Sequence, residues 1–156
     1  MKLERIASFQ VDHTRLEPGM YLSRADGDVV TYDIRFVKPN TPPFMEMPAV
    51  HTLEHLFATY ARSSRWKDGV IYVGPMGCRT GFYLLVREPD VSAEDAIRLA
   101  GEAMAFAAGY EGIIPGATEA ECGNYREHDL PKAREYARKM AAILSQWNIS
   151  LLSYNA

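Results

Sequence analysis

The chain of 156 residues carries 20 acidic and 17 basic side chains, and 47% of its residues are hydrophobic. This length predicts a single catalytic domain, residues 1–156, with a core of its own. The net charge of -3, with acids and bases interspersed, excludes the basic stripe typical of nucleic-acid-binding proteins. No apolar run approaches the roughly 18 residues of a membrane helix. The N-terminus also lacks the apolar region of a signal peptide, so the expected location is the cytoplasm.

The strands are expected mainly in the first half of the chain. Five segments have the apolar and β-branched content of strands: residues 6–11, 20–24, 28–37, 70–73 and 79–87. The Asp26-Gly27 pair separates the second and third of these segments and predicts a hairpin. In the third segment, Tyr32, Ile34 and Phe36 are expected on one face of the sheet. Hairpin pairing of this kind favours an antiparallel sheet.

Three segments have helical patterns: residues 48–63, 93–108 and 131–146. Ser92 and Asp95 have the spacing of a capping box at the start of the second helix. A short helical turn is expected at residues 117–122, and the last ten residues are expected to run over the surface. Strands, one helix, strands and then helices predict an α+β fold. Its helices would pack on one face of the antiparallel sheet, as a two-layer sandwich.

The strongest chemical signal is His51-Thr52-Leu53-Glu54-His55, an H-x-x-E-H motif in the first predicted helix. Histidines four residues apart project from one helical face, where two imidazoles can chelate one divalent transition metal. The carboxylate of Glu54 lies beside them and can move protons at a metal-bound group. The alternative is a pair of unrelated surface histidines. However, two of the chain's 4 histidines fall in this motif with an acid between them.

A catalytic metal site usually takes a third protein ligand, and the pattern leaves its identity open. The candidates are the two cysteines and several acids: Cys78, Cys122, Asp33, Glu119 and Glu121. Cys122 lies at a break between a helix and a loop, and a thiolate with two imidazoles suits Zn(II) or Fe(II). Cys78 is either a free thiol near the metal, with its thiolate favoured by the neighbouring Arg79, or a buried cysteine of a turn.

These segments together resemble the S-ribosylhomocysteine lyase family, the enzymes of autoinducer-2 synthesis. The matching segments occur over essentially the whole chain: residues 8–14, 32–36, 39–40, 51–56, 75–83, 121–125 and 128–130. The H-x-x-E-H motif alone is weak, since zinc peptidases with an inverted motif share it. Together with Pro75-Met76-Gly77-Cys78 and the downstream Cys122-Gly123 it is specific. One stretch departs from the family pattern of an acidic residue, an aliphatic residue and a serine: here it reads Tyr72-Val73-Gly74.

The resemblance implies a role for each candidate residue. His51, His55 and Cys122 would bind the metal, which is Fe(II) with Zn or Co as replacements, one ion per subunit. Glu54 and Cys78 would be the proton-transfer residues. The positions that hold the ribosyl part of the substrate would be Ser8, His13 and Arg35. His128 is expected to be a hydrogen-bonded structural residue. The resemblance also implies a homodimer with active sites at the subunit interface.

The implied reaction is that of a carbon-sulfur lyase. It cleaves the thioether of S-ribosylhomocysteine to homocysteine and 4,5-dihydroxypentane-2,3-dione, the autoinducer-2 precursor. Two carbonyl shifts move the sugar carbonyl from C1 to C3, after which the C4 proton is acidic enough for β-elimination. A Lewis-acidic metal suits the enediolates of such shifts. Cys78 is expected to act in the early shifts, and Glu54 in the later shift and the elimination.

Two other functions fit the motif. A metallohydrolase or peptidase-like enzyme would use Glu54 to activate water, but it would leave Cys78 idle. A non-catalytic, metal-stabilised binding protein would hold its ion in a closed site with four ligands.

Overall fold

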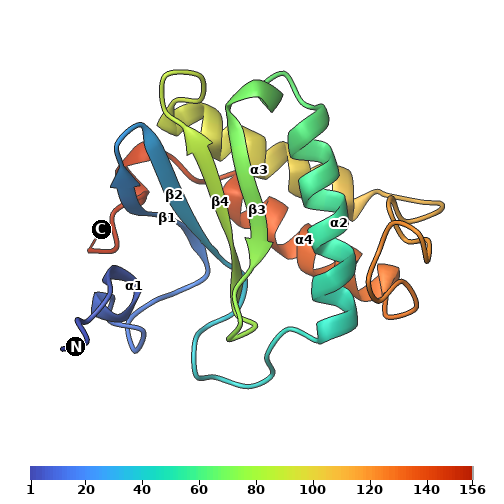
Figure 1. Cartoon of the computed structure of the whole chain (residues 1–156), viewed down its shortest axis with the longest axis horizontal. Coiled ribbons are helices and arrows are strands. Elements are labelled where there is room, and N and C mark those ends of the chain that lie inside the picture. Colours follow the sequence, from blue (N-terminus) through green and yellow to red (C-terminus); the bar gives the residue numbers. More distant parts are fainter. Residues whose placement is uncertain (156) are drawn as a thin grey trace.

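The structure is a computed structural model that describes residues 1–155. One antiparallel sheet has the order β1-β2-β4-β3, with β1 at Gly19–Asp26, β2 at Val29–Arg35, β3 at Val70–Pro75 and β4 at Gly81–Arg87. Three long helices pack on it: α2 at Met47–Ser63, α3 at Ala93–Ala108 and α4 at Leu130–Leu144 (Figure 1). Short helical turns lie at Ala7–Gln10 (α1), Lys67–Gly69 (η1) and Ile149–Leu151 (η2). The predicted α+β sandwich is confirmed.

The sheet face toward the helices carries the core. Tyr32 and Ile34 of β2 lie opposite Leu84 and Phe82 of β4, and all four side chains are buried with the apolar faces of the helices. Phe36 continues the row just beyond the end of β2. The predicted alternation along this strand is therefore confirmed, because one face of the strand packs against the helices.

We call the opposite sheet face the outer face; it carries Asp33 and Arg35 of β2 and Tyr83 of β4. Asp33 pairs directly with Tyr83 across the two strands. Asp33 and Arg35 are only 2% and 3% exposed, although the long helices of the described chain pack on the other face (Figure 1). A buried carboxylate and a buried guanidinium are stable only when they are paired and hydrogen-bonded. They form a salt bridge with each other.

The end of the chain runs over the surface, as expected, and covers part of the outer face (Ala156 lies outside the described residues). Leu152 is buried, and its carbonyl accepts a 2.7 Å hydrogen bond from the β1 backbone. The hydroxyl of Tyr154 donates to Asp33 at 2.8 Å. The tail is held to the sheet because these polar groups find their partners there.

The prediction of a strand at residues 6–11 is wrong. Residues 7–10 form the single turn α1, in which the amide of Phe9 donates to the carbonyl of Ile6 at 3.0 Å. Both of these side chains are exposed. A short apolar run does not distinguish a strand from a helical turn by its pattern alone. Residues 117–122 contain a short hydrogen-bonded turn, as expected, in which the amide of Cys122 donates to the carbonyl of Thr118 at 3.0 Å.

The longer helices lie where the patterns predicted them, with ends that differ by one or two residues. The capping box between Ser92 and Asp95 is formed at the start of α3. Asp129 caps α4 by accepting a hydrogen bond from the amide of Lys132 at 3.0 Å. None of the helices within residues 1–155 combines the length and the hydropathy needed to cross a membrane.

Gly81 is a point at which the sheet accepts no side chain. A Cβ atom there would lie 2.3 Å from the carbonyl oxygen of Ile34 on the neighbouring strand. We expect Gly81→Ala to lower the free energy of unfolding by about 1–3 kcal/mol, the usual cost of overpacking a tight site. Urea denaturation followed by circular dichroism measures this change.

Gly77→Ala is the matched control for this prediction, because a Cβ atom at Gly77 would meet nothing within 4 Å. Equal stability of the two variants would contradict the close approach of β4 to β2.

Candidate metal centre

Helix α2 presents the two histidines of the motif on one face. Pro48 lies in its first turn, and Leu53 and Phe57 are buried against the core. The rings of His51 and His55 are half-buried, and their centroids are 4.7 Å apart. The spacing of four residues therefore brings two imidazoles together, as the pattern predicted.

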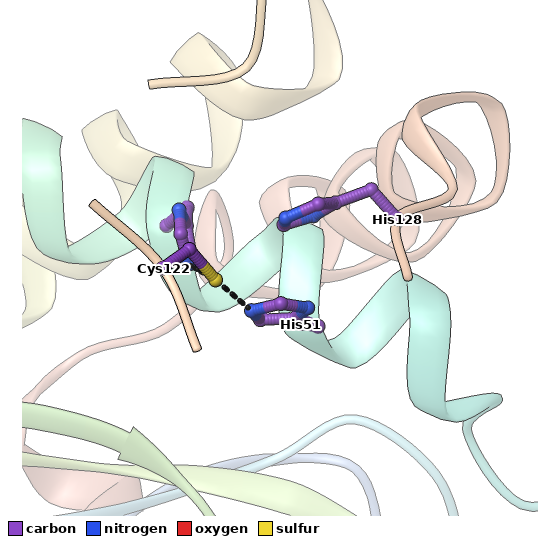
Figure 2. Close-up of side chains that lie close together, drawn as sticks. His51, Cys122 and His128 are labelled. Atoms are coloured by element: carbon purple, nitrogen blue, oxygen red, sulfur yellow. Dashed lines mark hydrogen bonds between the residues drawn. The ribbon is translucent and has the colours of Figure 1, made fainter. Parts of the chain in front are cut away.

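A long loop, residues 109–129, brings Cys122 to this pair. Its Sγ atom lies 3.3 Å from Nε2 of His51 and 3.9 Å from Nε2 of His55 (Figure 2). Among the described residues, one group could hold a metal ion: His51, His55, Cys122 and His128, with one ligand-type atom from each lying within 4.8 Å of the others. Of the third ligands that the sequence left open, only Cys122 joins this group.

Backbone carbonyls of the loop fix the tautomers of the two motif histidines. Nδ1 of His51 lies 2.7 Å from the carbonyl of Glu127, and Nδ1 of His55 lies 2.7 Å from the carbonyl of Pro115. A carbonyl oxygen only accepts, so each Nδ1 carries a proton and donates it. Each Nε2 then presents a lone pair toward the thiol, which is how second-shell acceptors orient metal-binding histidines.

Gly116 allows the loop to pass close enough to His55 for the 2.7 Å hydrogen bond between Nδ1 and the carbonyl of Pro115. Its φ angle is 67°, in the left-handed region, and a Cβ atom there would lie 3.3 Å from Nδ1 of His55. Glycine therefore suits this position both for its backbone angle and for the space beside the imidazole.

His128 is a member of the group that sequence reasoning missed. Its ring stacks on His51 at 4.0 Å, and Figure 2 shows it pointing toward Cys122 and His51. The hydroxyl of Thr52 donates to the carbonyl of Pro48. Nδ1 of His128, 2.9 Å from that same hydroxyl oxygen, must therefore be the donor of their hydrogen bond. Nε2 of His128 is left as a bare acceptor.

This Nε2 atom of His128 is buried and has no hydrogen-bond partner among residues 1–155. Burial, followed by the charges of His51 and His55, lowers the pKa of His128 to about 4. The ring is therefore neutral at physiological pH, when its lone pair is available. Three imidazole lone pairs and one thiol that face one another fit a divalent transition metal such as Zn(II) or Fe(II). No pattern signals His128, because it lies in an irregular loop without periodicity.

Glu54 lies beside this group. With His51 it lines a groove of about 210 Å³, which also includes Pro75 of β3 and Asn124 of the loop. The carboxylate of Glu54 makes no hydrogen bond or ion pair to any side chain or backbone group within residues 1–155. It is therefore available to a ligand bound in the groove.

Cys78 is an exposed cysteine in the turn between β3 and β4, so the alternative of a buried turn cysteine is excluded. Its Sγ atom lies 3.0 Å from Oγ1 of Thr80. It is not part of the His-Cys group. Arg35 is buried, and its guanidinium donates to Asp33 and to Thr80. A guanidinium has five N–H donors, and three of those of Arg35 are used in these hydrogen bonds within residues 1–155.

Ser8 and His13 belong to the N-terminal segment. Ser8 lies in α1, and Nδ1 of His13 hydrogen-bonds with the carbonyl of Val11 at 2.8 Å. In Figure 1, α1 and the loop 109–129 lie at opposite ends of the longest axis of the molecule. Within one chain, Ser8 and His13 are therefore separated from the metal-binding group.

Comparison with known proteins agrees with this geometry. Residues 6–150 match the model of the family described as S-ribosylhomocysteinase (LuxS). The chain belongs to the LuxS family. It is 44% identical to the S-ribosylhomocysteine lyase of Clostridium acetobutylicum, over 97% of this chain and 99% of that protein. It is 46% identical to the lyase of Desulfotalea psychrophila over 88% and 89%, and 44% identical to that of Phocaeicola vulgatus over 97% and 98%.

For this LuxS-family chain, we expect Cys122→Ala to lower metal affinity by at least 10-fold, because loss of a ligand exceeds the roughly 10–100-fold cost of losing a second-shell partner. Competition of the Fe(II)-loaded protein with a chelator of known affinity, under anaerobic conditions, measures the change.

Cys78→Ala is the matched control, since it removes the other cysteine and leaves the His-Cys group intact. An unaltered metal affinity in Cys122→Ala would show that this thiol is not a ligand.

Proposed function

We propose a division of labour among the residues of this chain for the reaction of its family. Membership of the LuxS family makes the protein a carbon-sulfur lyase that acts on S-ribosylhomocysteine. The observation that carries the proposal is the groove shared by Glu54 and His51, beside a group of three imidazoles and a thiol.

We propose that His51, His55 and Cys122 hold one Fe(II) ion per subunit, with Zn(II) or Co(II) as possible replacements. The orientation of Nε2 in both histidines and the distances to the thiol support this set. When bound, such an ion supplies Lewis-acid stabilisation for the negative charge that develops on the sugar oxygens.

The chemistry requires proton transfers at four neighbouring carbons. In the first shift a proton leaves C2 and one is delivered to C1, which moves the carbonyl to C2. In the second shift a proton leaves C3 and one is delivered to C2. With the carbonyl at C3, a base removes the C4 proton, the C4–C5 double bond forms and the C5–S bond breaks. The thiolate of homocysteine leaves, and the remaining enol tautomerises to 4,5-dihydroxypentane-2,3-dione.

Glu54 and Cys78 are the groups we assign to these transfers. Glu54 has no hydrogen-bond or ion-pair partner among residues 1–155, lies in the groove beside His51, and would act in the later shift and the elimination. Cys78 is exposed and hydrogen-bonded to Thr80, and it would act in the early shifts. Two bases on different elements suit a substrate whose protons move on both sides of the sugar.

The protein would work as a homodimer with its active sites at the subunit interface. Ser8, His13 and Arg35 are the candidate contacts of the ribosyl group. The N-terminal segment that carries Ser8 and His13 lies at the opposite end of the molecule from the loop of the metal-binding group (Figure 1). One substrate can touch both sets only if they come from two copies. The exposed apolar side chains of Ile6 and Phe9 beside Ser8 support a contact surface in this segment.

The experiment that tests this function is release of homocysteine thiol from S-ribosylhomocysteine by the anaerobically purified Fe(II) protein. We expect Cys78→Ala to lower turnover by about 10²–10⁴-fold, the usual contribution of a general acid or base. Its metal content should stay stoichiometric.

Retained turnover in Cys78→Ala would remove this thiol from the reaction. Peptide cleavage without thiol release by the unaltered protein would favour the metallohydrolase alternative.

The shared site is tested by mixing two inactive variants, Glu54→Gln and His13→Ala, under conditions that exchange subunits. If one site takes Glu54 from one chain and His13 from the other, a mixed dimer has one intact site and one doubly altered site. We expect about a quarter of the unaltered activity after random exchange in a two-fold dimer.

Dimers of each variant alone, treated identically, are the controls for this experiment. No recovery on mixing would place both residues of a site in the same chain.

A further inference from the structure

A continuous series of hydrogen bonds joins the C-terminal tail to the thiol of Cys78. Tyr154 donates to Asp33 at 2.8 Å, and Arg35 donates to both carboxylate oxygens of Asp33 at 3.0 and 2.6 Å. The Nη1 atom of Arg35 also donates to Oγ1 of Thr80 at 2.8 Å. The same Oγ1 atom lies 3.0 Å from Sγ of Cys78.

The direction of the last hydrogen bond follows from the chemistry of its neighbours. A guanidinium can only donate, so Oγ1 of Thr80 is an acceptor toward Arg35. The hydroxyl has a single proton of its own, which remains for Sγ of Cys78. When Cys78 is a thiolate it has no proton to give, so the hydroxyl must be the donor. A hydrogen bond from a neutral hydroxyl to an anion is of the stronger, charge-assisted kind.

Thr80 is held rigidly enough to keep this geometry. It is only 2% exposed, and its carbonyl accepts hydrogen bonds from the amides of Phe36 and Val37 at 2.8 and 3.2 Å. The turn before it is tight, since the amide of Arg79 donates to Met76 and the φ angle of Arg79 is 61°. Non-glycine residues rarely adopt this left-handed conformation, and the turn that holds Arg79 in it keeps Cys78 beside Thr80.

From this geometry we propose that Thr80 is a positioning residue for Cys78. Arg35 donates to the hydroxyl oxygen of Thr80, and the hydroxyl is thereby oriented to donate its own proton to Sγ of Cys78, which favours the thiolate. The inference rests on the proposed function of Cys78 in proton transfer. A thiolate at neutral pH is the form that can accept a proton from the sugar. Thr80 itself has no contact with the reacting atoms in this scheme, and it acts through Cys78.

The charged and titratable groups around Cys78 come from several elements. Asp33 and Arg35 lie on β2, Tyr83 lies on β4, and Arg79 lies in the same turn. Tyr154 reaches Asp33 from the tail. Burial, followed by the charge of Asp33, raises the pKa of both Tyr83 and Tyr154. Both phenols therefore stay neutral in the range in which a thiol ionises, so they do not obscure its titration.

The test is the pH profile of Cys78 alkylation by iodoacetamide in the metal-loaded protein, read by mass spectrometry of the peptide that contains Cys78. This readout separates Cys78 from Cys122 and requires no turnover. We expect Thr80→Val to move the midpoint of the profile upward by about one pH unit and to slow alkylation at neutral pH by about 3–10-fold. Thr80→Ser keeps the hydroxyl and should retain the unaltered profile.

Thr31→Val is the matched control, because it removes a threonine hydroxyl from the neighbouring strand β2 that has no side-chain hydrogen bond among the described residues. Thr80→Ala removes the hydroxyl without adding bulk and serves if Thr80→Val does not fold, as judged by circular dichroism. An upward shift in either variant, absent in Thr80→Ser and Thr31→Val, supports the role of Thr80. Unaltered profiles in the variants without the hydroxyl overturn it.

The two proposals fail separately. If the unaltered protein releases no homocysteine, the proposed function is wrong whatever the alkylation profile. If it releases homocysteine while the alkylation profile is the same with and without the hydroxyl of Thr80, only the positioning role is wrong.

Discussion

The metal centre depends on one constraint: every donor hydrogen of three imidazoles is committed to a fixed oxygen. His51 and His55 donate to carbonyls of the loop, and His128 donates to the hydroxyl of Thr52. Three lone pairs and a thiol are left facing one another, and one of these acceptors, Nε2 of His128, is buried without a partner among residues 1–155, which is costly. A divalent cation bound at this group would remove that cost. Because the loop 109–129 supplies both carbonyls and two of the four side chains, its order and the binding of metal are thermodynamically linked.

The sheet separates this centre from the second set of candidate residues. Its inner face packs on α2, so the helix that carries the motif is anchored by Leu53 and Phe57 in the core. Its outer face carries Asp33 and Arg35, and the turn with Cys78 lies at one end of it. The two sets of candidate residues therefore belong to opposite sides of the sheet. In the proposed homodimer, one site would be completed across two such surfaces.

Helical and strand periodicity predicted the parts of this protein that pack regularly. The face shared by His51 and His55 and the buried row of β2 follow from spacings of four and two residues. Cys122 was one of several candidates, because an irregular loop has no period that places it. His128 was missed for the same reason, although its position six residues after Cys122 brings it to the group. The segment of α1 has the apolar content of a strand, but composition does not show whether a partner strand lies beside it. The structure provides no such partner within residues 1–155, and the segment forms a helical turn.

The buried pair of Asp33 and Arg35 fixes the directions of the hydrogen bonds on the outer face. Such pairs contribute little net stability, because desolvation of both ions offsets their attraction. Here each ion has further partners, since Tyr154 donates to the carboxylate and Arg35 donates to Thr80. The carboxylate neutralises the net charge of the guanidinium but leaves its N–H groups fixed in direction. Cys78 therefore faces the oriented hydroxyl of Thr80 and not the net charge of Arg35. Such a hydroxyl dipole stabilises a thiolate only at a suitable distance and angle, and the turn at Arg79 maintains both.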